Sequence, residues 1–172
     1  MNDMLPLIEP LIPALRRYAR SLLRDRSAAD DLVQDCLERA VANWGQRRDA
    51  NPRSWMFTIL HNLAMTRLRS NASKPRHVAI EDADEDIFAR APSQEDGLRY
   101  TELLAALARL PEEQRAVLLL ATVEGLSYAE TADVLGVPVG TVMSRLSRAR
   151  ERLLREMDAD AVAPVSHLRR VK

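Results

Sequence analysis

Residues 127–150 read SYAETADVLGVPVGTVMSRLSRAR, and this run predicts two helices joined by a short turn. Ser127 with Glu130 three residues later has the form of a capping box, which starts a helix. Gly136 ends that helix, because glycine is favoured just beyond a helix C-terminus. A second, longer helix begins near residue 138 or 139 and runs to about Met157. A short capped helix, a turn and a longer basic helix together predict a helix-turn-helix.

The longer helix has an apolar stripe on one side and serines and arginines on the other. At about 100° per residue, the stripe comprises Val142, Leu146, Ala149 and Leu153. The opposite side carries Ser144, Ser147, Arg148 and Arg155, and the stripe is flanked by Arg145 and Arg152.

This arrangement suits a helix in the DNA major groove. Arg148 would lie against base edges, with Ser144 and Ser147 as short hydrogen-bonding groups beside it. Arg145 or Arg152 would lie against phosphates. Between residues 139 and 155 there are five arginines and one glutamate, so the positive charge is local. The alternative reading is an arginine-rich surface helix that is only solvated.

An acidic segment separates this unit from the rest of the chain. Residues 71–97 contain three basic and seven acidic side chains and have no apolar periodicity. We expect a flexible, self-repelling linker there. One domain is expected over residues 1–70, a second over 98–158 and a flexible tail over 159–172. The sequence therefore predicts an all-α protein of two small helical domains, with the helix-turn-helix in the second.

Three helices are expected in the first domain. Apolar residues at three- and four-residue spacing begin near Leu11. A capping box at Ser27 is expected to start the second helix. Asn51, which precedes a proline, is expected to start the third helix, which ends at about Ser70.

The second and third of these helices differ in charge. The second has an acidic edge formed by Asp30, Asp31, Asp35 and Glu38. Such an edge either keeps the chain soluble or docks a basic partner. The third helix has arginines and aromatic residues and no acid, a composition that suits single-stranded nucleic acid. In this helix Trp55 is expected in the core, whereas Phe57, His61 and Asn62 are freer for a functional role.

Composition excludes several other classes of protein. The chain has 172 residues and equal numbers of basic and acidic side chains, 25 of each. Its single cysteine excludes an intramolecular disulfide, and no apolar run is long enough for a secretory signal or a membrane span. The three histidines lack spaced metal-ligand partners and the five glycines form no phosphate loop. We therefore expect a cytoplasmic protein that is not an enzyme and has no cofactor, no metal and no membrane insertion.

Four motifs across the chain together resemble bacterial RNA polymerase sigma factors of the small extracytoplasmic-function (ECF) type. They are DDLVQD at 30–35, WMFTILHNLA at 55–64, LPEEQR at 110–115 and GTVMSRLSRAR at 140–150. The resemblance implies that the first domain binds core RNA polymerase and melts and reads the downstream promoter element. The second domain would read the upstream element of the promoter DNA. It also implies an anti-sigma factor as a partner and a role in a stress or envelope response.

The resemblance also implies roles for individual residues. It places the polymerase contact at Asp31, Leu32, Gln34, Asp35 and Glu38. It places strand opening and downstream-element recognition at His61, Asn62, Arg67 and Arg69. It places upstream-element recognition at Ser144, Arg145, Ser147 and Arg148. Residues 11–19 resemble the alphaproteobacterial general-stress branch of the family.

Two rival functions come from other classes. The first is a helix-turn-helix regulator that binds duplex DNA as a dimer without polymerase. A shift of duplex DNA by the isolated protein at nanomolar concentration would favour that rival. The second is an enzyme, for which the sequence offers neither a pocket signature nor a set of spaced catalytic groups.

Overall fold

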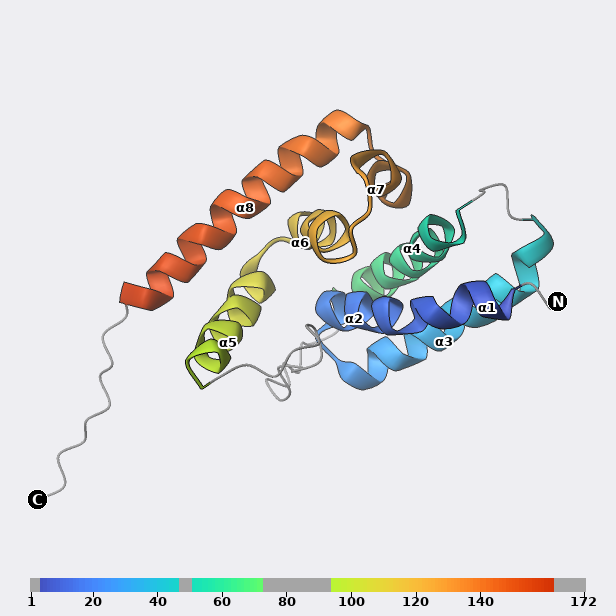
Figure 1. Cartoon of the computed structure of the whole chain (residues 1–172), viewed down its shortest axis with the longest axis horizontal. Helices are drawn as coiled ribbons and strands as arrows, with labels where there is room; N and C mark the ends of the chain where they lie inside the picture. The colour runs from blue at the N-terminus through green and yellow to red at the C-terminus, as the bar shows by residue number, and fades with distance from the viewer. Residues whose placement is uncertain (1–3, 47–50, 73–93, 163–172) are drawn as a thin grey trace, which may run out of the picture.

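The computed structural model describes residues 4–46, 51–72 and 94–162, and every regular element in these ranges is helical (Figure 1). Most of the predicted linker and most of the predicted tail lie outside the described residues. None of the described helices is long and apolar enough to cross a membrane. The prediction of an all-α fold is confirmed.

The first half of the chain forms a helical unit, here called the N-terminal unit. Its elements are α1 (Leu5–Ile8), η1 (Glu9–Leu11), α2 (Ile12–Leu23), α3 (Arg26–Asn43), η2 (Trp44–Gln46) and α4 (Pro52–Ala72). The start of α3 differs from the prediction, because its N-cap is Asp25 and not Ser27. The Asp25 side chain accepts a hydrogen bond from the backbone N–H of Ala28 at 2.9 Å. Arg24, at φ 58°, makes the tight turn that brings Asp25 into this position.

The second half forms the C-terminal unit. Its elements are α5 (Gln94–Arg109), α6 (Glu112–Leu118), the π-helical turn η4 (Leu119–Val123), α7 (Tyr128–Leu135) and α8 (Val139–Val162). The predicted capping box at Ser127 and Glu130 is present, and Gly136 ends α7 in the left-handed region at φ 64°. The helix-turn-helix prediction is therefore confirmed. α5 begins four residues before the predicted boundary at 98, and α8 continues past Met157.

Two apolar clusters hold these helices together. The smaller one lies within the C-terminal unit and joins α5, α6, α7 and α8 through residues such as Leu110, Val117 and Leu146. The larger one is built on α2, α3 and α4, where Tyr18 and Phe57 are fully buried. The rings of these two residues meet edge to face, with centroids 5.5 Å apart.

The larger cluster also includes residues of the C-terminal unit. These residues are Ala116, Leu119, Leu120, Leu126 and Val134. Because they come from α6, η4, α7 and the η4–α7 connection, the two units are docked against each other. Figure 1 shows the same arrangement, in which α7 lies beside α4 and α6 lies beside α2, and contacts between these helix pairs are present.

Cys36 lies inside the larger cluster on α3. Its thiol is buried and donates a hydrogen bond to the carbonyl oxygen of Met56, with the sulfur 3.6 Å from the oxygen. Burial raises the pKa of this thiol to about 12. Cys36 is therefore a core residue.

Candidate nucleic-acid and partner interfaces

The exposed side of α8 carries most of the residues predicted to read the upstream element. Ser144, Ser147 and Arg148 are exposed, whereas Val142 and Leu146 on the other side are buried. α8 can turn its polar side outward because α5, α6 and α7 pack on its apolar stripe.

Arg145 differs from the other three predicted residues. Its side chain is three-quarters covered, and its Nη2 lies 2.8 Å from Oε2 of Glu113 on α6. The position explains this contact, since Arg145 flanks the stripe that packs on α6. In this structure Arg145 therefore forms an ion pair within the C-terminal unit. A contact with phosphate would require its side chain to break the ion pair with Glu113.

One exposed apolar residue, Met143, lies beside Ser147 on α8 and was not among the residues predicted to contact DNA. Met143 is 55% exposed, whereas Val139, which is 42% exposed, continues the apolar stripe at the start of α8. Apolar groups beside an arginine in the major groove contact the methyl group of thymine. The signal was present in the sequence, because Met143 lies outside the apolar stripe.

The acidic side of α3 has the exposure that a docking surface needs. Asp31, Gln34, Asp35 and Glu38 are exposed. Gln34 donates a hydrogen bond to Glu38 at 3.1 Å, so two of these side chains are linked along the helix. The prediction that Leu32 contacts a partner needs correction, because Leu32 is 2% exposed and belongs to the larger apolar cluster.

The predicted downstream-element residues on α4 are divided between the surface and the interior. Asn62 and Arg69 are exposed. Arg67 is half-buried and donates to the carbonyl oxygen of Ala28 at 3.3 Å, and its Nη2 lies 4.0 Å from Oδ2 of Asp31. Arg67 thus connects α4 to the acidic side of α3.

His61 is in the interior and not on the surface where a DNA contact was predicted. It is 8% exposed, and its Nδ1 is hydrogen-bonded to the hydroxyl of Tyr18 at 3.0 Å. Burial, together with the charge of Arg69, lowers the pKa of His61 to about 4, so the imidazole is neutral at neutral pH. Phe57, also expected to be free, is fully buried. Both corrections have one cause, which is that α2, α3 and α7 pack around α4 and leave little of it exposed.

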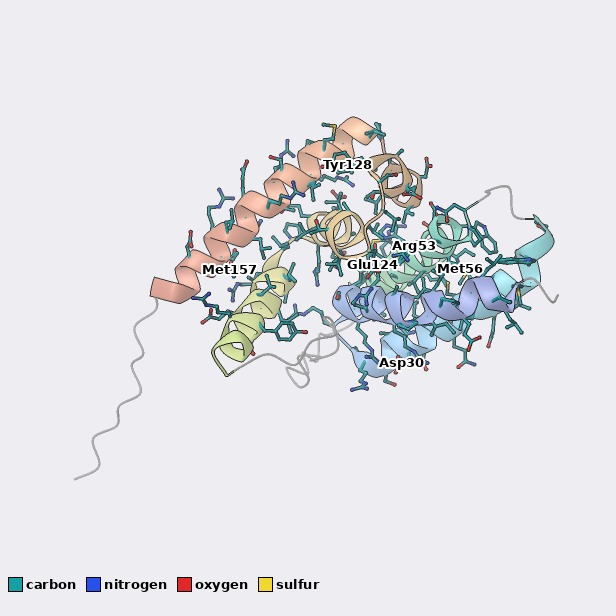
Figure 2. The ribbon with its side chains drawn as sticks, viewed as in Figure 1. Asp30, Arg53, Met56, Glu124, Tyr128 and Met157 are labelled. Carbon is teal, nitrogen blue, oxygen red and sulfur yellow. The ribbon has the colours of Figure 1, made fainter. Side chains whose placement is uncertain are left out.

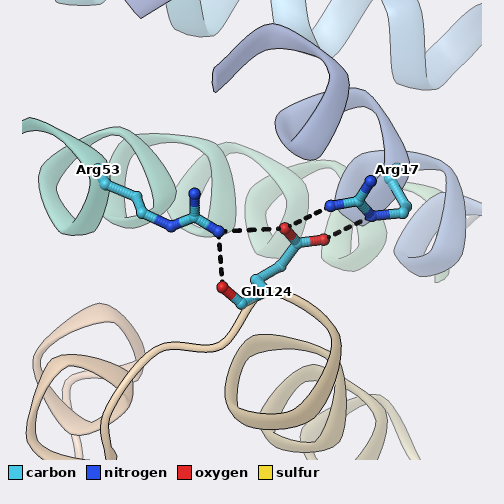
Figure 3. Close-up of polar contacts among 3 residues, drawn as sticks. All are labelled: Arg17, Arg53 and Glu124. Atoms are coloured by element: carbon cyan, nitrogen blue, oxygen red, sulfur yellow. Dashed lines mark hydrogen bonds and ion pairs between the residues drawn. The ribbon is translucent and has the colours of Figure 1, made fainter. Parts of the chain in front are cut away.

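An ion cluster at the contact between the two units was not predicted. The Glu124 carboxylate, in the connection after η4, is 1% exposed. It accepts two hydrogen bonds from Arg17 of α2, from Nε at 2.9 Å and from Nη2 at 2.8 Å (Figure 3). Nη2 of Arg53, in the first turn of α4, lies 3.5 Å from the same carboxylate and donates to the Glu124 carbonyl oxygen at 2.6 Å. Figure 2 shows Arg53 and Glu124 at the junction of the two units, far from Asp30.

Further polar contacts surround this cluster. Asn51 donates to Glu130 of α7 at 2.6 Å, and Arg115 of α6 donates to the carbonyl oxygen of Ser21 at 3.3 Å. The hydrogen bonds that Glu130 accepts, first from the Ser127 backbone and side chain and also from Asn51, hold the pKa of its carboxyl below the usual range. The junction therefore combines apolar burial with charge-assisted hydrogen bonds, which are the stronger kind.

Comparison with known proteins matches both units. Residues 8–61 match the family model described as the Sigma2 domain of PhyR, and residues 100–153 match Sigma-70, region 4. The chain is 42% identical over 147 residues to the ECF RNA polymerase sigma factor EcfG of Rhodopseudomonas palustris strain TIE-1, covering 83% of this chain and 78% of that protein.

Two solved structures have a similar fold. The sigma factor RpoE of Bartonella quintana, in complex with the anti-sigma factor NepR, matches with a TM-score of 0.76 and 33% identity, covering 93% of this chain and 99% of that one. CnrH, in complex with the cytosolic domain of CnrY, matches with a TM-score of 0.66 and 28% identity, covering 90% of this chain and 87% of that one.

Proposed function

Because the chain belongs to the ECF family of RNA polymerase sigma factors, we propose that it binds core RNA polymerase and directs initiation at specific promoters. The observation that carries this proposal is the pair of matches in chain order, a Sigma2 domain followed by Sigma-70 region 4. The exposed surfaces agree with it, since an acidic side of α3 and a basic side of α8 are both exposed.

The polymerase contact is proposed on α3. Asp31, Asp35 and Glu38 present carboxylates to solvent, and Gln34 lies among them. Such a surface suits a basic partner and steers association with it. Leu32 supports the contact only indirectly, because its packing in the core holds the helix in place.

Promoter contacts are proposed on both units. On α8, Ser144, Ser147 and Arg148 form the exposed reader of the upstream element. On α4, Asn62 and Arg69 are exposed and suit contacts with the opened downstream strand. The proposed domain boundaries remain 1–70 and 98–158, because the matched regions 8–61 and 100–153 fall within them.

An anti-sigma factor is proposed as the regulator of this protein. RpoE of Bartonella quintana was solved with the anti-sigma factor NepR, and CnrH with CnrY. We also propose that the protein belongs to the general-stress branch, as residues 11–19 predict. We place the protein in the cytoplasm, where polymerase and promoters are, and assign it no enzymatic activity of its own.

Reconstituted transcription tests the proposal. Purified core RNA polymerase is mixed with the protein on a library of promoter fragments, and the transcripts are sequenced. We expect transcripts that start at a defined distance from a shared pair of sequence elements. The stand-alone regulator is tested on the same fragments without core polymerase. A tight duplex shift without polymerase, combined with no promoter-dependent transcript when polymerase is added, would overturn the assignment.

A further inference from the structure

The two arginines that hold Glu124 form an anion site on the N-terminal unit. Arg17 and Arg53 come from different helices and converge on one carboxylate (Figure 3). The site is complete without the C-terminal unit, which supplies only the anion. An arginine fork that binds carboxylate through two parallel hydrogen bonds can bind phosphate in the same way.

All the acids that the described residues place beside this arginine pair belong to the C-terminal unit. Glu124 is bonded to both arginines, and Glu130 of α7 is close enough for Arg53 to help lower the pKa of its carboxyl. Asp30, by contrast, pairs with Arg16 and Arg20 elsewhere on α2. When the C-terminal unit leaves, its acids leave with it, and Arg17 and Arg53 keep their positive charge without these carboxylates.

The helix that carries Arg53 favours a nucleic acid as the replacement anion. α4 contains Arg53, Arg67 and Arg69 and no acidic residue. The Arg53 guanidinium also lies 5.6 Å from the centre of the Phe57 ring, which helps to fix its orientation. Arginines along one helix without intervening acids suit the repeated phosphates of a single strand.

We propose that Arg17 and Arg53 bind the phosphate backbone of opened promoter DNA, and that Glu124 occupies the same site when the two units are docked. This inference rests on the proposed function, because it assigns the strand to the unit that would capture it. Docking and strand binding at this site are then mutually exclusive. The exposed side of α8 stays uncovered in the docked arrangement, so docking withholds one DNA site and leaves the other accessible.

Two variants of the whole chain distinguish a phosphate site from an ion pair that only holds the two units together. Glu124→Gln removes the competing charge and keeps the arginines. The double variant Arg17→Ala with Arg53→Ala also removes the ion pairs between the two units. Unlike Glu124→Gln, it removes the proposed phosphate site as well. Small-angle X-ray scattering measures undocking as a larger radius of gyration, and fluorescence anisotropy measures binding of a labelled single-stranded DNA oligonucleotide.

Both variants are expected to undock, but only Glu124→Gln is expected to bind the oligonucleotide several-fold more tightly than the wild type. The double variant is expected to bind more weakly. Its plot of log affinity against log salt concentration should be shallower than that of Glu124→Gln by about 1.4, the value for two phosphate contacts on a single strand. The variant Arg16→Ala with Arg39→Ala removes the same charge from the N-terminal unit away from the site, and it should not undock.

If Glu124→Gln and the double variant gain equally in affinity for the oligonucleotide, the two arginines serve only to hold the units together, and the proposal is overturned. The absence of undocking in Glu124→Gln would overturn the claim that Glu124 competes for the site. A third arm uses poly-L-glutamate as the probe. If the double variant loses poly-L-glutamate binding and keeps oligonucleotide binding, the site belongs to an acidic partner and not to DNA.

A last measurement separates this inference from the proposed function. The same variants are combined with core RNA polymerase on a template whose downstream element is already unpaired. We expect Glu124→Gln to support wild-type transcription, and the double variant to lose transcription as salt rises. If the wild type gives no transcripts, the proposed function fails. If the wild type is active and the double variant shows the same salt dependence, only the present inference fails.

Discussion

Arg148 is the residue from which upstream specificity is expected to come. Its side chain is exposed on α8 beside Ser144 and Ser147. Arg148→Ala should reduce discrimination at one base position by about 1–3 kcal/mol, the value of a bidentate contact with guanine. Transcription from promoters randomised in the upstream element measures this change. Arg150→Ala is the control, and it should weaken transcription evenly if it acts at all. Unchanged preference for Arg148→Ala would contradict the assignment.

Leu32 and Asp35 lie three residues apart on α3 but should respond to substitution in opposite ways. Leu32→Ala removes a core side chain and should lower the free energy of unfolding by about 2–5 kcal/mol. Asp35→Ala should change stability by no more than about 0.5 kcal/mol, since the side chain is exposed, and should weaken binding to core polymerase. Urea denaturation and polymerase affinity distinguish the two. Wild-type polymerase affinity for Asp35→Ala would count against the acidic surface.

His61 should make stability depend on pH in a defined window. Its pKa is lowered from 6.5 to about 4 in the folded chain, so the unfolded chain binds more protons between these values. The free energy of unfolding should therefore be highest above pH 6.5 and should fall as pH falls toward 4, by about 1.4 kcal/mol for each pKa unit of difference. His61→Gln, which keeps a partner for the Tyr18 hydroxyl, should flatten this slope. An equal slope in urea titrations of both proteins would contradict the account.

At the scale of elements, α7 and its turn into α8 illustrate how a local signal fixes structure. Gly136 has φ 64°, and a Cβ added there would meet no atom within 4 Å. The cost of Gly136→Ala is therefore a backbone cost, about 1–2 kcal/mol for the left-handed conformation. Gly136→Asn is the control and should lose less, because asparagine tolerates this region. Thermal denaturation compares the stability of the two variants. Equal losses of stability would mean that a steric clash of the added side chain, and not the left-handed backbone, causes the cost.

Most helix positions could be predicted because caps and apolar spacing are local. Ser127, Glu130 and Gly136 define α7 from residues within ten positions of one another. The failure at Ser27 is also local, since Asp25 two residues earlier offers a competing cap. For α4, local signals do not predict burial correctly. Its apolar spacing indicates one buried side, whereas neighbours distant in sequence bury Phe57 and His61 as well.

At the scale of the whole molecule, the docked arrangement could not be read from the sequence. Glu124 is 107 residues from Arg17 and 71 from Arg53, and each reads as an ordinary surface charge in its own segment. The prediction of two helical domains held, and family resemblance followed from motifs within each domain. What the resemblance did not specify is which charges of one unit meet those of the other, because that depends on three-dimensional proximity alone.

The shared apolar cluster predicts cooperative unfolding. Since the larger cluster contains residues of both units, the wild type should unfold in one calorimetric transition. Glu124→Gln should weaken the coupling by about 1.5–3 kcal/mol, the range for hydrogen bonds to charged groups, and should divide the transition in two. The control is Asp30→Asn, whose ion pairs lie within the N-terminal unit and which should leave a single transition. Two transitions in the wild type would show that docking does not couple the units.

The thiol of Cys36 has a practical consequence for following these movements. Because it is buried and its pKa is about 12, it resists alkylating dyes at neutral pH. The protein contains no other sulfhydryl. A fluorophore pair can therefore be attached at two cysteines engineered into α3 and α8 while the native one is left in place, so that energy transfer within single molecules reports separation of the halves in real time.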